Sequence, residues 1–149
     1  MKRFVSFLLA SLLLFSGIVA SAANTEIIVN GKTAVIAEGM GKIVNENDRT
    51  FVPLRFLLEY LDFSVDWDDK TETAIGVNKN GDSFLVQIGN KTLFYFKENG
   101  QKANLTKMDV APFLNVSEGR TYVPLRFLAE AMGYVVGWDG RTETVTLTK

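Results

Sequence analysis

Short apolar runs separated by polar turns make up much of the chain. The pairs Asn30-Gly31, Asn80-Gly81 and Asn99-Gly100 each lie between two such runs. An Asn-Gly pair readily adopts the two positive φ angles of a tight type I′ turn. The pattern therefore predicts three antiparallel hairpins, which join residues 27–29 to 33–36, 74–77 to 84–88, and 93–96 to 103–105.

Two segments instead show the roughly 3.6-residue period of a helix. In each, four apolar residues fall at positions i, i+3, i+4 and i+7: Leu54, Leu57, Leu58 and Leu61, and then Leu125, Leu128, Ala129 and Met132. Pro53 and Pro124 come directly before these stripes. We expect them at the first helical position, where a missing N–H costs nothing. Asp62 and Gly133 are expected at the C′ position that follows each helix.

Both helical segments belong to a repeated sequence. Residues 49–77 and residues 120–148 are identical at 15 of 29 positions, and the two tryptophans of the chain are in register. Similarity of this extent indicates an internal duplication. We expect one α+β domain over residues 24–149, made of two units, about 24–79 and 80–149, that each contain a hairpin, a helix and a second hairpin. Two closely joined domains are the alternative.

The N-terminus has the features of a secretory signal peptide. Lys2 and Arg3 precede an almost unbroken apolar run over residues 4–19, and small residues follow at positions 20–23. Residues 1–23 are therefore predicted to be removed, with cleavage after Ala22 or Ala23, which leaves the protein secreted or at the cell envelope. An uncleaved anchor is the alternative, because the apolar run is close to the minimum length that spans a bilayer.

Composition narrows the chemistry of the remaining chain. The sequence has neither His nor Cys, which excludes a copper or zinc centre built on imidazole or thiolate and any Ser-His-Asp or Cys-His nucleophile. We expect no metal and no cofactor. Loss of Lys2 and Arg3 leaves 14 of the 16 basic residues against 17 acidic residues. Such a chain has no electrostatic attraction for nucleic acid, and no segment after the signal peptide is apolar enough to span a membrane.

The repeat carries a family resemblance. Val-Pro-Leu-Arg-Phe-Leu occurs at residues 52–57 and 123–128, and each copy is followed by Glu, by Trp-Asp and by Thr-Glu-Thr. This combination resembles the copper amine oxidase N-terminal-like, or stalk, domain of exported proteins of Gram-positive bacteria. The resemblance implies an α+β fold in which a twisted antiparallel sheet wraps the short helices. It implies no copper chemistry and no enzyme, because the family takes its name from a non-catalytic region of those oxidases.

The charged residues of the repeat have a structural interpretation. Arg55 with Glu59, and Arg126 with Glu130, are four residues apart on the helices. An exposed pair of this kind stabilises a helix only weakly. We therefore expect each Arg to reach the following hairpin, at Asp68 or Asp139, and so to join helix to sheet. Each Asp is also expected to start a turn.

The repeated tryptophans have two interpretations. Trp67 and Trp138 come two residues after Val65 and Val136. Because side chains alternate along a strand, each Trp is predicted to share the buried face of its Val and to fill the core. The alternative is an exposed platform on which a sugar stacks.

An acidic cluster follows the first helix, consisting of Asp62, Asp66, Asp68, Asp69 and Glu72. Calcium prefers several such oxygen ligands, but the spacing matches no EF-hand loop, and the second repeat lacks three of the five acids. This favours solvated turns over a calcium site. A carboxylate-based extracellular hydrolase that uses pairs among Asp66, Asp68 and Glu72 is the enzymatic alternative.

Phe94, Tyr95 and Phe96 are the most distinctive feature outside the repeat, and they are our candidate binding patch. Tyr95 must face away from the two phenylalanines on a strand, so one aromatic face is available for binding unless both sheet faces are covered. Together the observations favour a secreted, non-catalytic binding or scaffolding module of the cell envelope. Its partner would be a cell-wall polymer, a carbohydrate or another exported protein. An inhibitor or accessory partner of a co-secreted enzyme is a further alternative, and the oligomeric state stays open.

Overall fold

The computed structural model of the protein describes residues 24–98 and 102–149. The predicted signal peptide and the Asn99-Gly100 turn lie outside these ranges. Within them the chain forms short strands and two short helices, α1 (Leu54–Tyr60) and α2 (Leu125–Ala131). This confirms the predicted α+β class.

The strands form three sheets, where the resemblance implies a single one. The first, in the order β12-β13-β1-β2, contains β1 (Glu26–Val29), β2 (Lys32–Thr33), β12 (Val135–Asp139) and β13 (Thr144–Thr148). The second, in the order β10-β11-β4-β3, contains β3 (Val44–Glu46), β4 (Arg49–Pro53), β10 (Phe113–Asn115) and β11 (Arg120–Pro124). The third runs in chain order through β5 (Phe63–Asp68), β6 (Thr73–Asn78), β7 (Ser83–Gln87), β8 (Thr92–Lys97) and β9 (Lys102–Lys107).

Neighbouring strands are antiparallel, with the exception of β1 and β13, which are parallel. The three predicted hairpins are present as β1-β2, β6-β7 and β8-β9. In the first, Asn30 and Gly31 have φ angles of 47° and 79°, as a type I′ turn requires. The type I′ turn predicted at Asn80-Gly81 is wrong, because Gly81 has a φ angle of 86° but that of Asn80 is not positive. Pairing of β1 with β13, and of β6 with β7, joins strands across the expected boundary between the units near residue 80.

The two helices begin where β4 and β11 end. Pro53 and Pro124 are the N-cap residues, with extended ψ angles of 123° and 113°. Each proline is therefore the N-cap, one position before the first helical residue, where the sequence predicts the first helical residue itself. The proline φ angle also suits the end of a strand, which explains this difference. Asp62 and Gly133 have φ angles of 63° and 85° and follow the helices as predicted.

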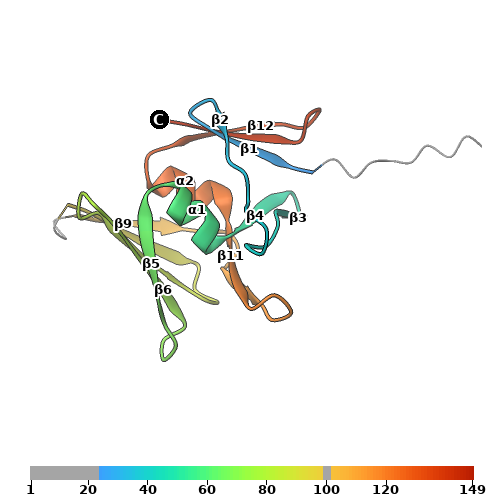
Figure 1. Cartoon of the computed structure of the whole chain (residues 1–149). Helices are drawn as coiled ribbons and strands as arrows, with labels where there is room; N and C mark the ends of the chain where they lie inside the picture. The colour runs from blue at the N-terminus through green and yellow to red at the C-terminus, as the bar shows by residue number, and fades with distance from the viewer. Residues whose placement is uncertain (1–23, 99–101) are drawn as a thin grey trace, which may run out of the picture.

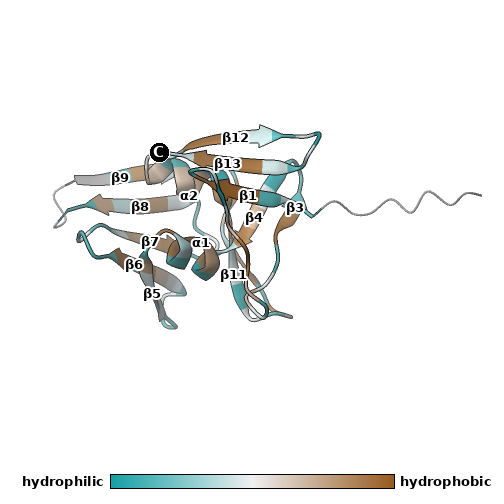
Figure 2. Cartoon of the chain, turned by 45° about the horizontal axis from the view of Figure 1, so that its top comes forward, coloured by the Kyte–Doolittle hydropathy of each residue, from teal (hydrophilic) through white to brown (hydrophobic). Residues whose placement is uncertain are grey.

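One apolar core takes side chains from both helices and from all three sheets. Figure 1 shows α1 and α2 side by side at the centre, between the β5–β9 sheet and the sheet that contains β1 and β12. The predicted helical stripes supply much of this core: Leu54, Leu57, Leu58, Leu125, Leu128, Ala129 and Met132 are all buried. In Figure 2 the hydrophobic colour marks both helices and strands β1 and β13.

The third sheet packs closely around Phe84. This ring is fully buried, lies 5.2 Å from the ring of Phe63, and covers Gly76, its partner residue on β6. A Cβ atom at Gly76 would come within 2.3 Å of the Phe84 ring, a distance at which one of them must move.

Gly76→Ala should therefore destabilise the protein. Overpacking of a core costs about 1–3 kcal/mol, which exceeds the roughly 0.5–1 kcal/mol that a strand alanine gains over glycine. Urea unfolding followed by circular dichroism measures the change. Gly140→Ala is the control, since its Cβ would approach the indole nitrogen of Trp138 no closer than 3.4 Å. An unchanged midpoint for Gly76→Ala would contradict the packing of Phe84.

Candidate functional site

Trp67 and Trp138 are exposed, so the prediction that they fill the core is wrong. Trp67 is 37% exposed and Trp138 is 48% exposed. Along one face of β5, burial decreases from Phe63, which is buried, through Val65 to Trp67. Alternation predicts which face a side chain shares, but it does not predict how far the layer covering that face extends. Both tryptophans lie beyond the edge of the layer that covers the buried residues of their strands.

Trp67 lies in a groove of about 670 Å³, which we call the Trp67 groove. Its walls come from the start of α1, from β5, from the segment that leads into β6, and from the turn before β11. The lining side chains that bear on its chemistry are Pro53, Arg55, Asp66, Trp67, Asp69, Glu72, Glu118 and Arg120.

A groove of about 860 Å³ surrounds Trp138 in the same way, and we call it the Trp138 groove. Its walls come from the start of α2, from β12, from the segment that leads into β13, and from the turn before β4. The corresponding side chains are Glu46, Asp48, Arg49, Asp109, Pro124, Arg126, Trp138 and Glu143. Most of these residues are 71 positions from a residue that lines the Trp67 groove, so the repeated sequence forms two grooves of one kind.

One arginine in each groove comes from the other copy of the repeat. In the Trp67 groove, Arg120 donates hydrogen bonds to the carbonyl oxygens of Glu118, at 2.8 Å from Nη1, and of Gly39. Tyr122 fixes the same turn, because its hydroxyl donates to Glu118 Oε2 at 2.6 Å. The guanidinium is thus held by backbone and not by a carboxylate.

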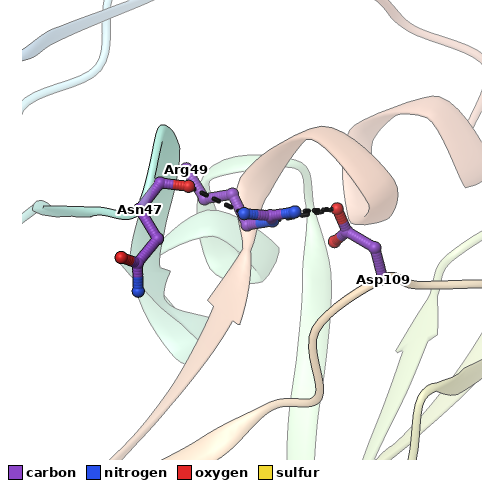
Figure 3. Close-up of polar contacts among 3 residues, drawn as sticks. All are labelled: Asn47, Arg49 and Asp109. Carbon is purple, nitrogen blue, oxygen red and sulfur yellow. Dashed lines mark hydrogen bonds and ion pairs between the residues drawn. The ribbon is translucent and has the colours of Figure 1, made fainter.

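In the Trp138 groove the equivalent arginine has a charged partner. Arg49 donates from Nη1 to the carbonyl oxygen of Asn47 at 2.7 Å, and its Nε lies 2.9 Å from Asp109 Oδ2, an ion pair shown in Figure 3. The hydrogen bond from Arg49 lowers the pKa of Asp109, and the same bond raises the pKa of Arg49.

The helix arginines also line the grooves, which corrects their predicted role. Arg55 and Arg126 are exposed, and in the described part of the chain neither forms a hydrogen bond or ion pair with Asp68 or Asp139. Arg126 instead forms an ion pair on its own helix, with 3.6 Å between its Nη1 and Glu130 Oε1.

Asp68 and Asp139 start turns, as predicted. Asp68 accepts hydrogen bonds from the amide of Lys70 at 3.0 Å and from Thr71 Oγ1 at 2.9 Å, and these bonds, led by that from Thr71, lower its pKa. Asp139 accepts from the amide of Arg141 at 2.9 Å. Because its hydrogen bonds favour the ionised form, Asp68 is a poor general acid.

The other acids of the predicted cluster separate. Asp66, Asp69 and Glu72 line the Trp67 groove, whereas Asp62 lies at the helix end with positive φ. Across residues 24–98 and 102–149, no group of three or more acidic, His or Cys side chains is arranged to hold a metal ion.

Both grooves have the same formal charge. Each contains two arginines and four carboxylates and therefore carries a net charge of −2. The charged residues are Arg55, Arg120, Asp66, Asp69, Glu72 and Glu118 in one groove, and Arg49, Arg126, Glu46, Asp48, Asp109 and Glu143 in the other. Such a surface repels anionic polymers and still offers many hydrogen-bonding groups.

The aromatic patch on β8 divides between the two faces of its sheet. Tyr95 is buried, at 5% exposed, and donates to Asp82 Oδ2 at 3.0 Å, so it is unavailable to a ligand. Two causes raise the pKa of Tyr95 to about 12: burial is the larger, and the hydrogen bond to Asp82 is the next. Phe94 and Phe96 are half-buried on the opposite face. None of the three lines either groove.

The sequence predictions omit several groove residues, among them Arg49, Arg120 and Asp109. Arg49 and Arg120 each precede Thr at equivalent positions of the repeat, and this recurrence is a sequence signal that could have identified them. Asp109 has no such signal, because it binds an arginine 60 positions away and lies outside both copies of the repeat.

Comparison with known families agrees with the resemblance seen in the sequence. The family model described as copper amine oxidase N-terminal domain matches residues 28–147. No curated protein and no solved structure matches the chain. Among the described residues, no helix is long and apolar enough to cross a membrane.

Replacement of Arg49 by Gln should raise the pKa of Asp109 toward its ordinary value. Because the folded-state pKa of Asp109 lies below its unfolded value, the pair stabilises the fold above the unfolded pKa. That contribution disappears as the pH falls through the folded pKa, and Arg49→Gln should weaken this acid dependence. NMR titration of the Asp109 carboxyl carbon measures the shift. Arg120→Gln is the control and should leave Asp109 unchanged; an identical titration in Arg49→Gln would refute the pair.

Proposed function

The chain belongs to the copper amine oxidase N-terminal domain family, a non-catalytic stalk-like domain. We propose that it is a secreted, non-catalytic module that binds uncharged glycan chains of the cell envelope. The observation that carries the proposal is the half-exposed tryptophan in each of two equivalent grooves.

The groove chemistry favours a sugar. A Trp ring offers a large apolar face and an N–H group at its edge, which suits the mixed apolar and hydroxyl surface of a pyranose. Arginine and carboxylate side chains around each ring supply donors and acceptors that orient hydroxyl groups. The exposed ring faces have no other partner among the aromatic contacts of the described residues.

Charge narrows the class of glycan. With a net charge of −2, each groove disfavours phosphate-rich or uronic wall polymers, whereas an uncharged chain of N-acetylated sugars meets no repulsion. The signal-peptide pattern at residues 1–23 supports export to the compartment where such chains occur.

The Trp67→Ala/Trp138→Ala double variant should lose glycan binding. Burial of a large apolar side chain away from water contributes about 1.5–3 kcal/mol, so its loss corresponds to at least about ten-fold in affinity. Co-sedimentation with chitin and with peptidoglycan freed of anionic polymers measures the effect.

Tyr60→Ala is the matched control for this experiment. Tyr60 is 36% exposed on α1 but lines neither groove, so its removal should leave binding unchanged. Circular dichroism establishes that each variant is folded. Undiminished binding by the folded double variant, or equal loss in Tyr60→Ala, would argue against the proposed site.

A further inference from the structure

The pairing of β4 with β11 has two-fold symmetry. The three partner pairs are Phe51–Pro124, Val52–Val123 and Pro53–Tyr122. Each residue of β11 is 71 positions after its equivalent on β4, so exchange of the two strands reproduces the same set of pairs. Val52 and Val123 are equivalent residues paired with each other, which is the pattern at the axis of an isologous dimer.

This symmetry explains how the grooves are assembled. Trp67 shares its groove with Arg120, and Trp138 shares its groove with Arg49. Each groove therefore combines a tryptophan from one copy of the repeat with an arginine from the other. The two-fold rotation that places β4 on β11 also places the pair Trp67 and Arg120 on the pair Trp138 and Arg49. One strand pairing therefore produces two equivalent grooves.

The two grooves are spatially independent. They have no lining residue in common. Their tryptophans are on β5 and β12, which belong to different sheets and lie at opposite ends of the molecule in both Figure 1 and Figure 2. A chain bound in one groove leaves the other open.

The grooves also match in chemistry. Each has one tryptophan, two arginines and four carboxylates. They differ in the partner of the turn arginine, which is the Asp109 carboxylate in one and the Gly39 carbonyl in the other. The shared parts are those that would contact a sugar, so both grooves fit the same ligand class.

We infer that one molecule of this protein binds two uncharged glycan chains at once and bridges them. The inference rests on the proposed glycan binding. A single chain would then cross-link two glycan chains, and a bridge of this kind requires both grooves, whereas simple attachment requires one.

A capture experiment separates bridging from attachment. The protein is bound to chitin beads, washed, and then given a fluorescent, soluble N-acetylglucosamine hexamer; the readouts are the protein retained and the label captured. The wild type should capture label. Trp67→Ala and Trp138→Ala should each still be retained on the beads, since one of two equivalent sites remains, but each should capture at least about ten-fold less label per molecule of retained protein.

Each outcome bears on a different claim. Retention of wild-type protein without capture of label would overturn bridging and leave glycan binding intact. Capture by either single variant at the wild-type level would also overturn it, because one groove would then suffice. Failure of wild-type protein to bind the beads would instead refute the proposed function. Tyr60→Ala, which changes neither groove, should behave as wild type in both readouts.

Discussion

The antiparallel pairing of β4 with β11 determines how the two copies of the repeat are arranged. This pairing joins the two copies of the repeat at Val52 and Val123, which are both almost fully buried. It also fixes where α1 and α2 begin, since each helix starts directly after one of these strands. The helices then fill the space between the sheets, and the turn that precedes each strand reaches the groove beside the tryptophan of the other repeat.

The sequence predicts the local structure well and the assembly poorly. Asn-Gly turns, the Leu stripes and the positive φ angles of Asp62 and Gly133 depend on neighbouring residues, so short-range patterns are sufficient to find them. The parallel contact of β1 with β13 joins residues about 118 positions apart, and no local signal specifies it. The division of the strands into three sheets also depends on contacts between distant parts of the sequence, which no local pattern specifies.

The site shows the same limit. Recurrence in the sequence identifies the prolines, the tryptophans, Arg55 and Arg126 as candidate residues, but alternation along the strand wrongly predicts that Trp67 and Trp138 fill the core. Alternation gives the direction of a side chain, whereas exposure depends on how far the opposing layer extends. Arg49 and Asp109 meet only through the tertiary fold, so their ion pair has no sequence signature.

The repeated sequence supplies both grooves on which the proposed activity depends. Each of the two equivalent grooves has one tryptophan, and the chain contains only these two tryptophans. An NMR titration of ¹⁵N-labelled protein with a soluble N-acetylglucosamine oligomer therefore reports on each groove through one indole N–H signal. If each groove binds the sugar, both indole signals should shift, together with the signals of their groove neighbours. A shift of only one indole signal, or of neither, would contradict two equivalent glycan-binding grooves.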